Sequence, residues 1–92
     1  MRVSFYATLR KIVGTKQVEF ELPDEVCLHE ILDVVVRTYP DLSHELLDDA
    51  GELSRHIHLF VNGRGSKWLT DGMDTVVDGS QTIEFFPAVA GG

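Results

Sequence analysis

Two kinds of hydrophobic periodicity run through this chain and limit the folds that it can adopt. Several segments alternate apolar with polar residues, and a period of two predicts half-buried β-strands. These segments are residues 2–9, 17–22, 57–61 and 82–86. After the second segment, apolar residues recur at the spacing of one helical face, namely Leu28, Ile31, Leu32 and Val35. Because 92 residues leave room for one domain, the pattern predicts an α+β domain with one main helix on one face of a sheet of about four or five strands.

The residues that flank the helical segment indicate where it begins and ends. Cys27 occupies the N-cap position, where Ser or Thr is usual. Pro40 disfavours helical backbone in the residue before it, so the helix is expected to end near Tyr39. A further turn or two of helix is expected within residues 41–47.

Glycine and proline mark the connections between the expected strands. The first two strands are expected to form a β-hairpin across Gly14, and Pro23 ends the second strand because proline removes a ladder donor. Asn62-Gly63 after the third strand is a strong turn signal. A short strand is expected at residues 67–69.

Composition excludes several classes of function. The chain has 8 basic and 15 acidic residues, a net charge of −7, which argues against a nucleic-acid binder and favours a basic partner surface. No apolar run approaches the roughly 20 residues that span a bilayer, and the first residues lack the pattern of a signal peptide. We therefore expect a cytoplasmic protein that contacts neither nucleic acid nor membrane.

The candidate metal ligands and nucleophiles do not form a site in the sequence. Cys27 is the single cysteine, so an internal disulfide or a cysteine-rich metal site is excluded, and we expect a small buried residue there. His56 and His58 share one strand face, but no third ligand has a suitable spacing. With no phosphate-binding loop or dinucleotide motif either, neither a metal nor a bound cofactor is expected.

The last residues carry the most specific chemical signal. Residues 1–86 are expected to form the domain, and residues 87–92 an extended tail that reaches at most about 20 Å. The tail consists of Pro87, Ala88, Val89, Ala90, Gly91 and Gly92. Two glycines at the end allow a narrow site to enclose the backbone. The Gly92 carboxylate is a poor electrophile, but adenylation by ATP makes it an acyl donor from which a sulfur or nitrogen nucleophile displaces AMP.

Three motifs and the order of the elements resemble a known family. The motifs are Phe5-Tyr6-Ala7-Thr8-Leu9-Arg10 with Gly14, Val61-Asn62-Gly63, and Asp78-Gly79 followed by Ile83-Glu84-Phe85-Phe86-Pro87 and the Gly-Gly ending. They resemble the MoaD/ThiS family of ubiquitin-like β-grasp sulfur carriers, above all its MoaD-like branch and the archaeal small modifiers within it. The resemblance covers essentially the whole chain, although Ala88 stands where many relatives have a second proline.

This resemblance implies a carrier that has no active site of its own. It implies that a ubiquitin-activating-type enzyme similar to MoeB uses ATP and Mg²⁺ to adenylate Gly92, and that sulfur transfer then gives a C-terminal thiocarboxylate. In MoaD-like proteins this group supplies sulfur to molybdopterin, in a complex with the large subunit of molybdopterin synthase. Other branches supply sulfur to tRNA, thiazole or cysteine synthesis, and some attach their last glycine to target lysines. A pure binding module without terminal chemistry is a further alternative.

The same alternation predicts where partners dock. Tyr6, Phe60 and Phe86 fall on the polar side of their strands, so we expect them on the sheet face that the helix leaves open. Arg10 is expected to pair with acidic residues of a partner, although a solvated position is an equal alternative. Trp68 is compatible with the edge of the core or with the surface. The acidic stretch in residues 41–52 is either solvated or an electrostatic contact.

Overall fold

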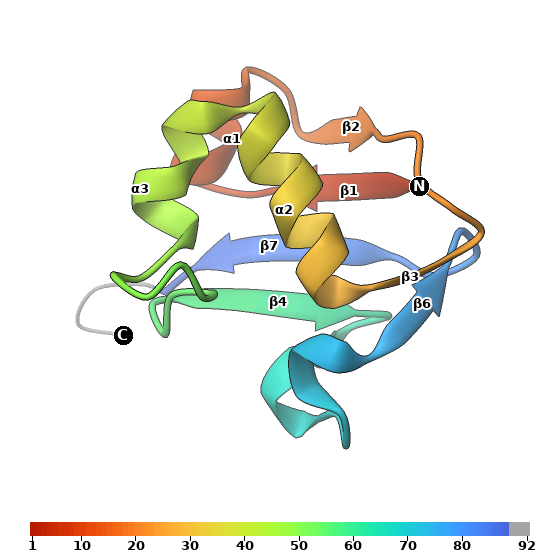
Figure 1. Ribbon diagram of the computed structural model, residues 1–92. Coiled ribbons are helices and arrows are strands. Elements are labelled where there is room, and N and C mark those ends of the chain that lie inside the picture. The colour runs from red at the N-terminus through yellow and green to blue at the C-terminus, as the bar shows by residue number, and fades with distance from the viewer. Residues whose placement is uncertain (89–92) are drawn as a thin grey trace.

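The computed structural model describes residues 1–88, which form a mixed sheet with helices packed on one face (Figure 1). The main sheet has the strand order β2-β1-β7-β4-β5. Its strands are β1 (Arg2–Phe5), β2 (Gln17–Glu19), β4 (Ile57–Val61), β5 (Arg64–Gly65) and β7 (Ile83–Pro87). A separate two-stranded sheet pairs β3 (Glu25–Cys27) with β6 (Val76–Asp78).

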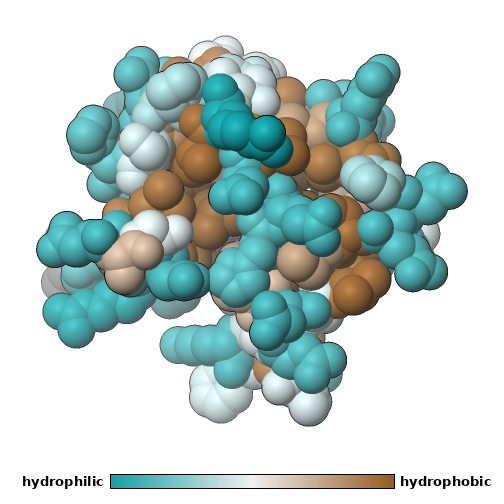
Figure 2. Space-filling view, in the orientation of Figure 1, coloured by the Kyte–Doolittle hydropathy of each residue, from teal (hydrophilic) through white to brown (hydrophobic). Residues whose placement is uncertain are grey.

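Short helices surround one long helix. The α-helices are α1 (Thr8–Val13), α2 (Leu28–Thr38) and α3 (Ser43–Leu46). Single 3₁₀ turns are formed by η1 (Pro40–Leu42), η2 (Ser66–Trp68) and η3 (Gly72–Asp74). In Figure 1, α2 lies in front of the central strands, and α1 and α3 lie toward one end of the sheet. Figure 2 shows this side of the molecule, where hydrophilic and hydrophobic residues are interspersed.

The two ends of the described chain meet at the centre of the sheet. Strands β1 and β7 pair in parallel, with Phe5 beside Phe85, and β7 pairs with β4 in antiparallel orientation, with Phe85 opposite Leu59. This topology confirms the predicted α+β class, with a five-stranded mixed sheet among the described residues and one main helix across it.

The core lies between the sheet and α2. Phe5 and Phe85 are fully buried and stack with ring centroids 5.8 Å apart. Helix α2 buries the four apolar residues that its periodicity predicted, namely Leu28, Ile31, Leu32 and Val35. The helix ends at Thr38 with Tyr39 as its C-cap, as Pro40 predicted. At its start Cys27 completes a capping box with Glu30, although the cysteine is half-buried rather than buried.

The predicted first strand was too long, because its second half is helical. Strand β1 ends at Phe5, and α1 begins at Thr8 after Ala7, whose φ of 54° breaks the extended backbone. Leu9 is buried as predicted, but from a helix, with Ile12 and Val13 packed on the same core. Strands β1 and β2 are antiparallel neighbours, yet α1 replaces the tight hairpin turn that we expected.

Other boundaries also differ from the predictions. Residues 67–69 lie in and directly after the 3₁₀ turn η2 instead of a strand, and the pairing of β3 with β6 was not predicted. Strand β7 runs one residue past Phe86, so Pro87 belongs to the sheet. Pro87 lies opposite Ile57, and the next cross-strand hydrogen bond runs from the Ala88 N–H to the His56 carbonyl, 2.6 Å away. Proline is tolerated because no donor to β4 is needed at its position.

The Phe5–Phe85 stack should dominate the stability of the domain. We expect Phe85→Ala to lower the free energy of unfolding by about 3–5 kcal/mol, because it removes a fully buried ring and leaves a cavity. Urea unfolding followed by far-UV circular dichroism measures this change. The matched control is Val76→Ala, at a residue that is 58% exposed, and its effect should stay within about 0.5 kcal/mol. Equal effects of the two substitutions would contradict the prediction.

Candidate functional site

Three aromatic side chains meet on the sheet face opposite α2. Tyr6 follows β1, Phe86 lies on β7 and Phe60 lies on β4. The rings of Tyr6 and Phe86 stack with centroids 4.1 Å apart and planes at 6°. Phe60 meets Phe86 edge to face at 5.2 Å. The structure therefore brings together the residues that alternation placed on the open face, and we call Tyr6, Phe60 and Phe86 the aromatic cluster.

Strand register explains why these rings meet. Successive side chains of a strand point to opposite faces, so Phe85 enters the core and Phe86 the open face. Phe86 lies opposite His58, and Phe60 lies opposite Glu84 in the same antiparallel pair. The aromatic cluster is thus built on the central strands that also carry the core.

Polar contacts hold Tyr6 in place. Its hydroxyl donates a hydrogen bond to the Glu84 carboxylate at 2.7 Å, and the Lys16 ammonium lies 5.2 Å above its ring. The pKa of the Tyr6 hydroxyl is raised above its ordinary value of 10.0. The main cause is the hydrogen bond that the hydroxyl donates to Glu84, and partial burial adds to it. Tyr6 therefore stays neutral at physiological pH, with its ring fixed against Phe86.

Arg10 lies apart from these contacts. It is exposed near the end of α1, and with Ala7, Lys11 and Gly14 it lines a shallow depression of about 430 Å³. No hydrogen bond, ion pair or ring contact within residues 1–88 joins its side chain to the aromatic cluster. The exposed position of Arg10 is compatible with both alternatives, contact with a partner and simple solvation.

The predicted tail is only partly described. Pro87 ends β7, and Ala88 is bonded to His56, so both continue directly from the aromatic cluster. Val89, Ala90, Gly91 and Gly92 lie outside the described residues. The roles predicted for Gly92 and for the other tail residues stay predictions.

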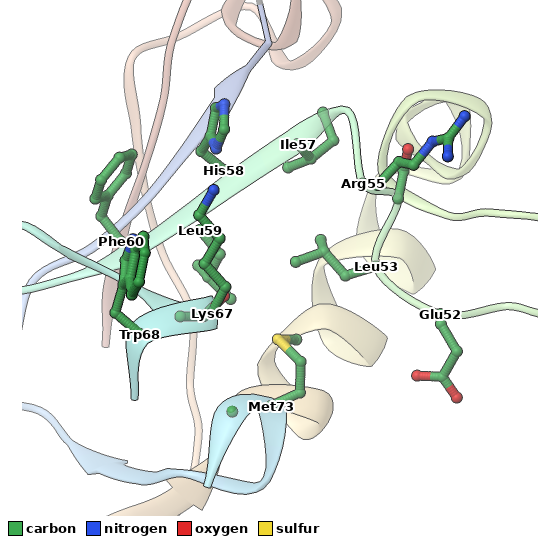
Figure 3. Close-up of a pocket in the computed structure, with 14 residues that line it drawn as sticks. Glu52, Leu53, Arg55, Ile57, His58, Leu59, Phe60, Lys67, Trp68 and Met73 are labelled. Carbon is green, nitrogen blue, oxygen red and sulfur yellow. The ribbon is translucent and has the colours of Figure 1, made fainter. Parts of the chain in front are cut away.

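The sequence was compatible with Trp68 at the edge of the core or at the surface, and the structure places it at the surface. Its residue is 70% exposed and stands against Gly65, beside Phe60. Figure 3 shows Trp68 and Phe60 next to each other at one side of a cavity of about 700 Å³, with Leu53 and Met73 across from them. No periodic pattern in the sequence indicated this position, because it depends on the space that Gly65 leaves in the folded chain.

The remaining polar clusters have structural roles. The Asp48 carboxylate in the acidic stretch accepts hydrogen bonds from the Ala50 and Glu52 backbone N–H groups, at 2.9 and 3.0 Å. His29 lies between two carboxylates, with Nδ1 3.8 Å from Glu52 and Nε2 3.6 Å from Asp74. Because the two nitrogens are on opposite sides of the imidazole ring, a single metal ion cannot bind His29 and both carboxylates at once.

Neither a cluster of metal-ligating side chains nor a membrane-spanning helix is found within the described part of the chain. Among residues 1–88, no group of three or more His, Cys, Asp or Glu side chains is arranged to hold a metal ion. Within the same residues, no helix has the length and apolar character required to span a bilayer.

Comparison with known proteins gives one consistent result. A protein-family model described as the ThiS family matches residues 3–92. Small archaeal modifier protein 3 of Haloferax volcanii is 34% identical over 92 residues, which are 100% of this chain and 98% of that relative. The crystal structure of SAMP1 from Haloferax volcanii superposes with a TM-score of 0.84 at 24% identity, over 99% of this chain and 97% of that one. The Amycolatopsis orientalis BexX/CysO complex contains a chain with a TM-score of 0.80 and 29% identity, over 99% and 98% of the two chains.

These matches agree with the sheet topology and confirm the predicted β-grasp fold. The chain belongs to the ThiS family of small ubiquitin-like β-grasp proteins, a family of sulfur carriers and protein modifiers that are generally not catalysts themselves.

Proposed function

We propose that this chain is a sulfur carrier whose Gly92 carboxylate is activated by a ubiquitin-activating-type enzyme. One observation carries the proposal: the family match extends through residue 92 and therefore includes the Gly91-Gly92 ending. The β-grasp body supplies recognition, and the terminal carboxylate supplies the reacting atom.

The chemistry requires two displacements. The Gly92 carboxylate attacks the α-phosphorus of ATP, pyrophosphate leaves, and an acyl-adenylate forms. A sulfide nucleophile then attacks the acyl carbon, AMP leaves, and the product is a thiocarboxylate. In this proposal the enzyme binds ATP and Mg²⁺, and the chain binds no cofactor.

The sulfur acceptor is the finer part of the proposal. The MoaD-like motifs favour molybdopterin, with this chain as the small subunit beside the large subunit of a molybdopterin synthase-like complex. Delivery of sulfur to tRNA or to a cysteine precursor is the alternative, and the match to the chain in the BexX/CysO complex shows that the same fold serves in another assembly.

The aromatic cluster is the proposed docking face for the activating enzyme, with Arg10 as a flanking contact. Half-buried aromatic rings that stack on one another present a rigid apolar surface, which is typical of interaction sites. Phe86 directly precedes Pro87, so an enzyme that binds the cluster holds the start of the tail. Because Pro87 belongs to β7 and Ala88 is bonded to His56, the four residues after Ala88 reach at most about 13 Å, which limits how far the enzyme's nucleotide site lies from the end of β7.

The terminal chemistry can be followed by intact mass. With its activating enzyme, ATP and Mg²⁺, the protein should gain the mass of AMP, and added sulfide should convert it to a species about 16 Da heavier than the free acid. Deletion of Gly92 should abolish both products, because it moves the carboxylate one residue away from the nucleotide. The control is Gly79→Ala, in the turn between β6 and β7, where an added Cβ meets nothing within 4 Å. Adenylation of the deletion variant would refute the role of the terminal carboxylate.

A protein modifier is the second candidate, favoured by the identity with small archaeal modifier protein 3. In this case a target lysine amine displaces AMP and leaves an isopeptide bond to Gly92. We expect tryptic digests of cells that express the protein to contain lysines carrying a remnant of its C-terminal residues, and cells with the Gly92 deletion to lack them. Their absence in both would leave sulfur transfer as the sole product of activation.

The docking face predicts a kinetic separation of binding from chemistry. Phe60→Ala should raise the KM for the protein in the adenylation reaction by about tenfold or more and leave kcat nearly unchanged, because the ring contacts the enzyme and not the reacting atoms. His44→Ala, at an exposed residue of α3, is the control and should change neither constant. A similar KM for both variants would exclude the aromatic cluster from the interface.

A further inference from the structure

Trp68 has an unusual position for a large apolar side chain. Only Trp68 and Val76 are large exposed hydrophobic residues within residues 1–88, at 70% and 58% exposure. A side chain with this exposure contributes little to the core. A single exposed apolar residue is ordinary, so the argument for a function depends on whether Trp68 adjoins other apolar side chains on the surface.

Gly65 creates the space in which the indole lies. A Cβ atom built on Gly65 would stand 3.2 Å from Trp68 Cδ1 and 3.9 Å from Phe60 Cε1. Gly65 has φ −62° and ψ 137°, which any residue adopts, so its backbone does not require glycine. What glycine provides here is the close approach of the indole to the strand beside Phe60.

Trp68 therefore extends the aromatic cluster to the far edge of the sheet. The rings follow one another from Tyr6 to Phe86 at 4.1 Å and from Phe86 to Phe60 at 5.2 Å, and Gly65 joins Phe60 to Trp68. We call this set of Tyr6, Phe86, Phe60 and Trp68 the aromatic stripe. It crosses β1, β7 and β4 and ends on η2.

Both ends of the aromatic stripe carry a lysine. Lys16 Nζ lies 5.2 Å from the ring centre of Tyr6, and Lys67 Nζ lies 5.6 Å from that of Trp68. Two carboxylates on the same face have partners within the chain: Glu84 accepts a hydrogen bond from the Tyr6 hydroxyl, and Glu19 forms ion pairs with the Met1 amino group and Arg2. The stripe is thus flanked by positive charge in a protein of net charge −7.

Charges in the adjoining cavity point the same way. Lys67 lines it beside Trp68, and Arg55 lines the opposite side together with one carboxylate, Glu52, which lies 3.8 Å from His29 (Figure 3). Positive side chains on this face favour an acidic partner surface, whereas the net charge of the whole chain predicted a basic one. A complementary partner carries acid groups here.

We propose that Trp68 is a partner-contacting residue and that the aromatic stripe docks an apolar surface of the activating enzyme flanked by carboxylates that face Lys16 and Lys67. The identity of the partner rests on the proposed function. The chemistry of its surface rests on the rings and lysines described above.

Kinetics of adenylation test the role of Trp68. Trp68→Ala should raise the KM for this protein about fivefold or more with kcat nearly unchanged, because the indole contacts the enzyme and not the tail. Gly65→Ala should raise KM in the same direction and shift the Trp68 fluorescence of the free protein, since the new methyl group displaces the indole without straining the backbone. Val76→Ala, at the other exposed hydrophobic residue, is the control and should leave KM unchanged. Equal KM values for Trp68→Ala and Val76→Ala overturn the proposal.

A charge reversal tests the chemistry of the partner. Lys67→Glu should raise KM more at low than at high salt, because salt screens the contact with the enzyme's carboxylates. Arg37→Glu makes the same change of charge at an exposed residue of α2, on the other side of the sheet, and should have no such effect. An equal effect of the two reversals would show that only net charge matters and would overturn the acidic partner surface.

Binding can be measured separately from adenylation. The probe is an activating enzyme whose own tryptophans are replaced by phenylalanine, so that Trp68 gives the only tryptophan signal. Adding this enzyme should change Trp68 fluorescence, whether or not Gly92 reacts. A fluorescence change without adenylation would support the docking surface and refute the proposed function. Adenylation without any change in Trp68 fluorescence would support the proposed function and refute the docking surface. The absence of both adenylation and a fluorescence change would refute both proposals.

Discussion

The parallel pairing of β1 with β7 is the contact on which the rest of the structure depends. It places the first and the last strand at the centre of the sheet, with Phe5 stacked on Phe85 beneath α2. Because β7 is central, it pairs with a strand on each side, and Ala88 continues directly from its last residue, Pro87. The last described residues are therefore attached to the strand that carries the buried Phe85.

The same strands also separate stability from recognition. Alternate residues of β7 face the core and the open side, so Phe85 stabilises the domain and its neighbour Phe86 is free to contact a partner. A shift of one residue in register would exchange the two rings, and the paired β1 and β4 on either side prevent it. A fold this small builds both surfaces from the same few strands.

Contacts on the open face fix the rings before any partner binds. The Tyr6 hydroxyl is held by Glu84, and the Trp68 indole lies in the space that Gly65 leaves. A preorganised surface loses less side-chain entropy on binding than a mobile one. The lysines at its ends place positive charge beside the outer rings although the whole protein is negative, so net charge alone is a poor guide to the partner.

The sequence by itself determined the α+β class, the face of α2, the strand Ile57–Val61 and the alternation that sends Tyr6, Phe60 and Phe86 to one side, because these depend on local periodicity. It also predicted the chemistry that we propose for the Gly92 carboxylate. Tertiary structure alone decided that residues 8–13 form a helix, since Leu9, Ile12 and Val13 suit either pattern until the core selects one. It also decided that Trp68 lies beside Phe60, because both rings approach the space that Gly65 leaves, and this arrangement of separate elements leaves no periodic trace in the sequence.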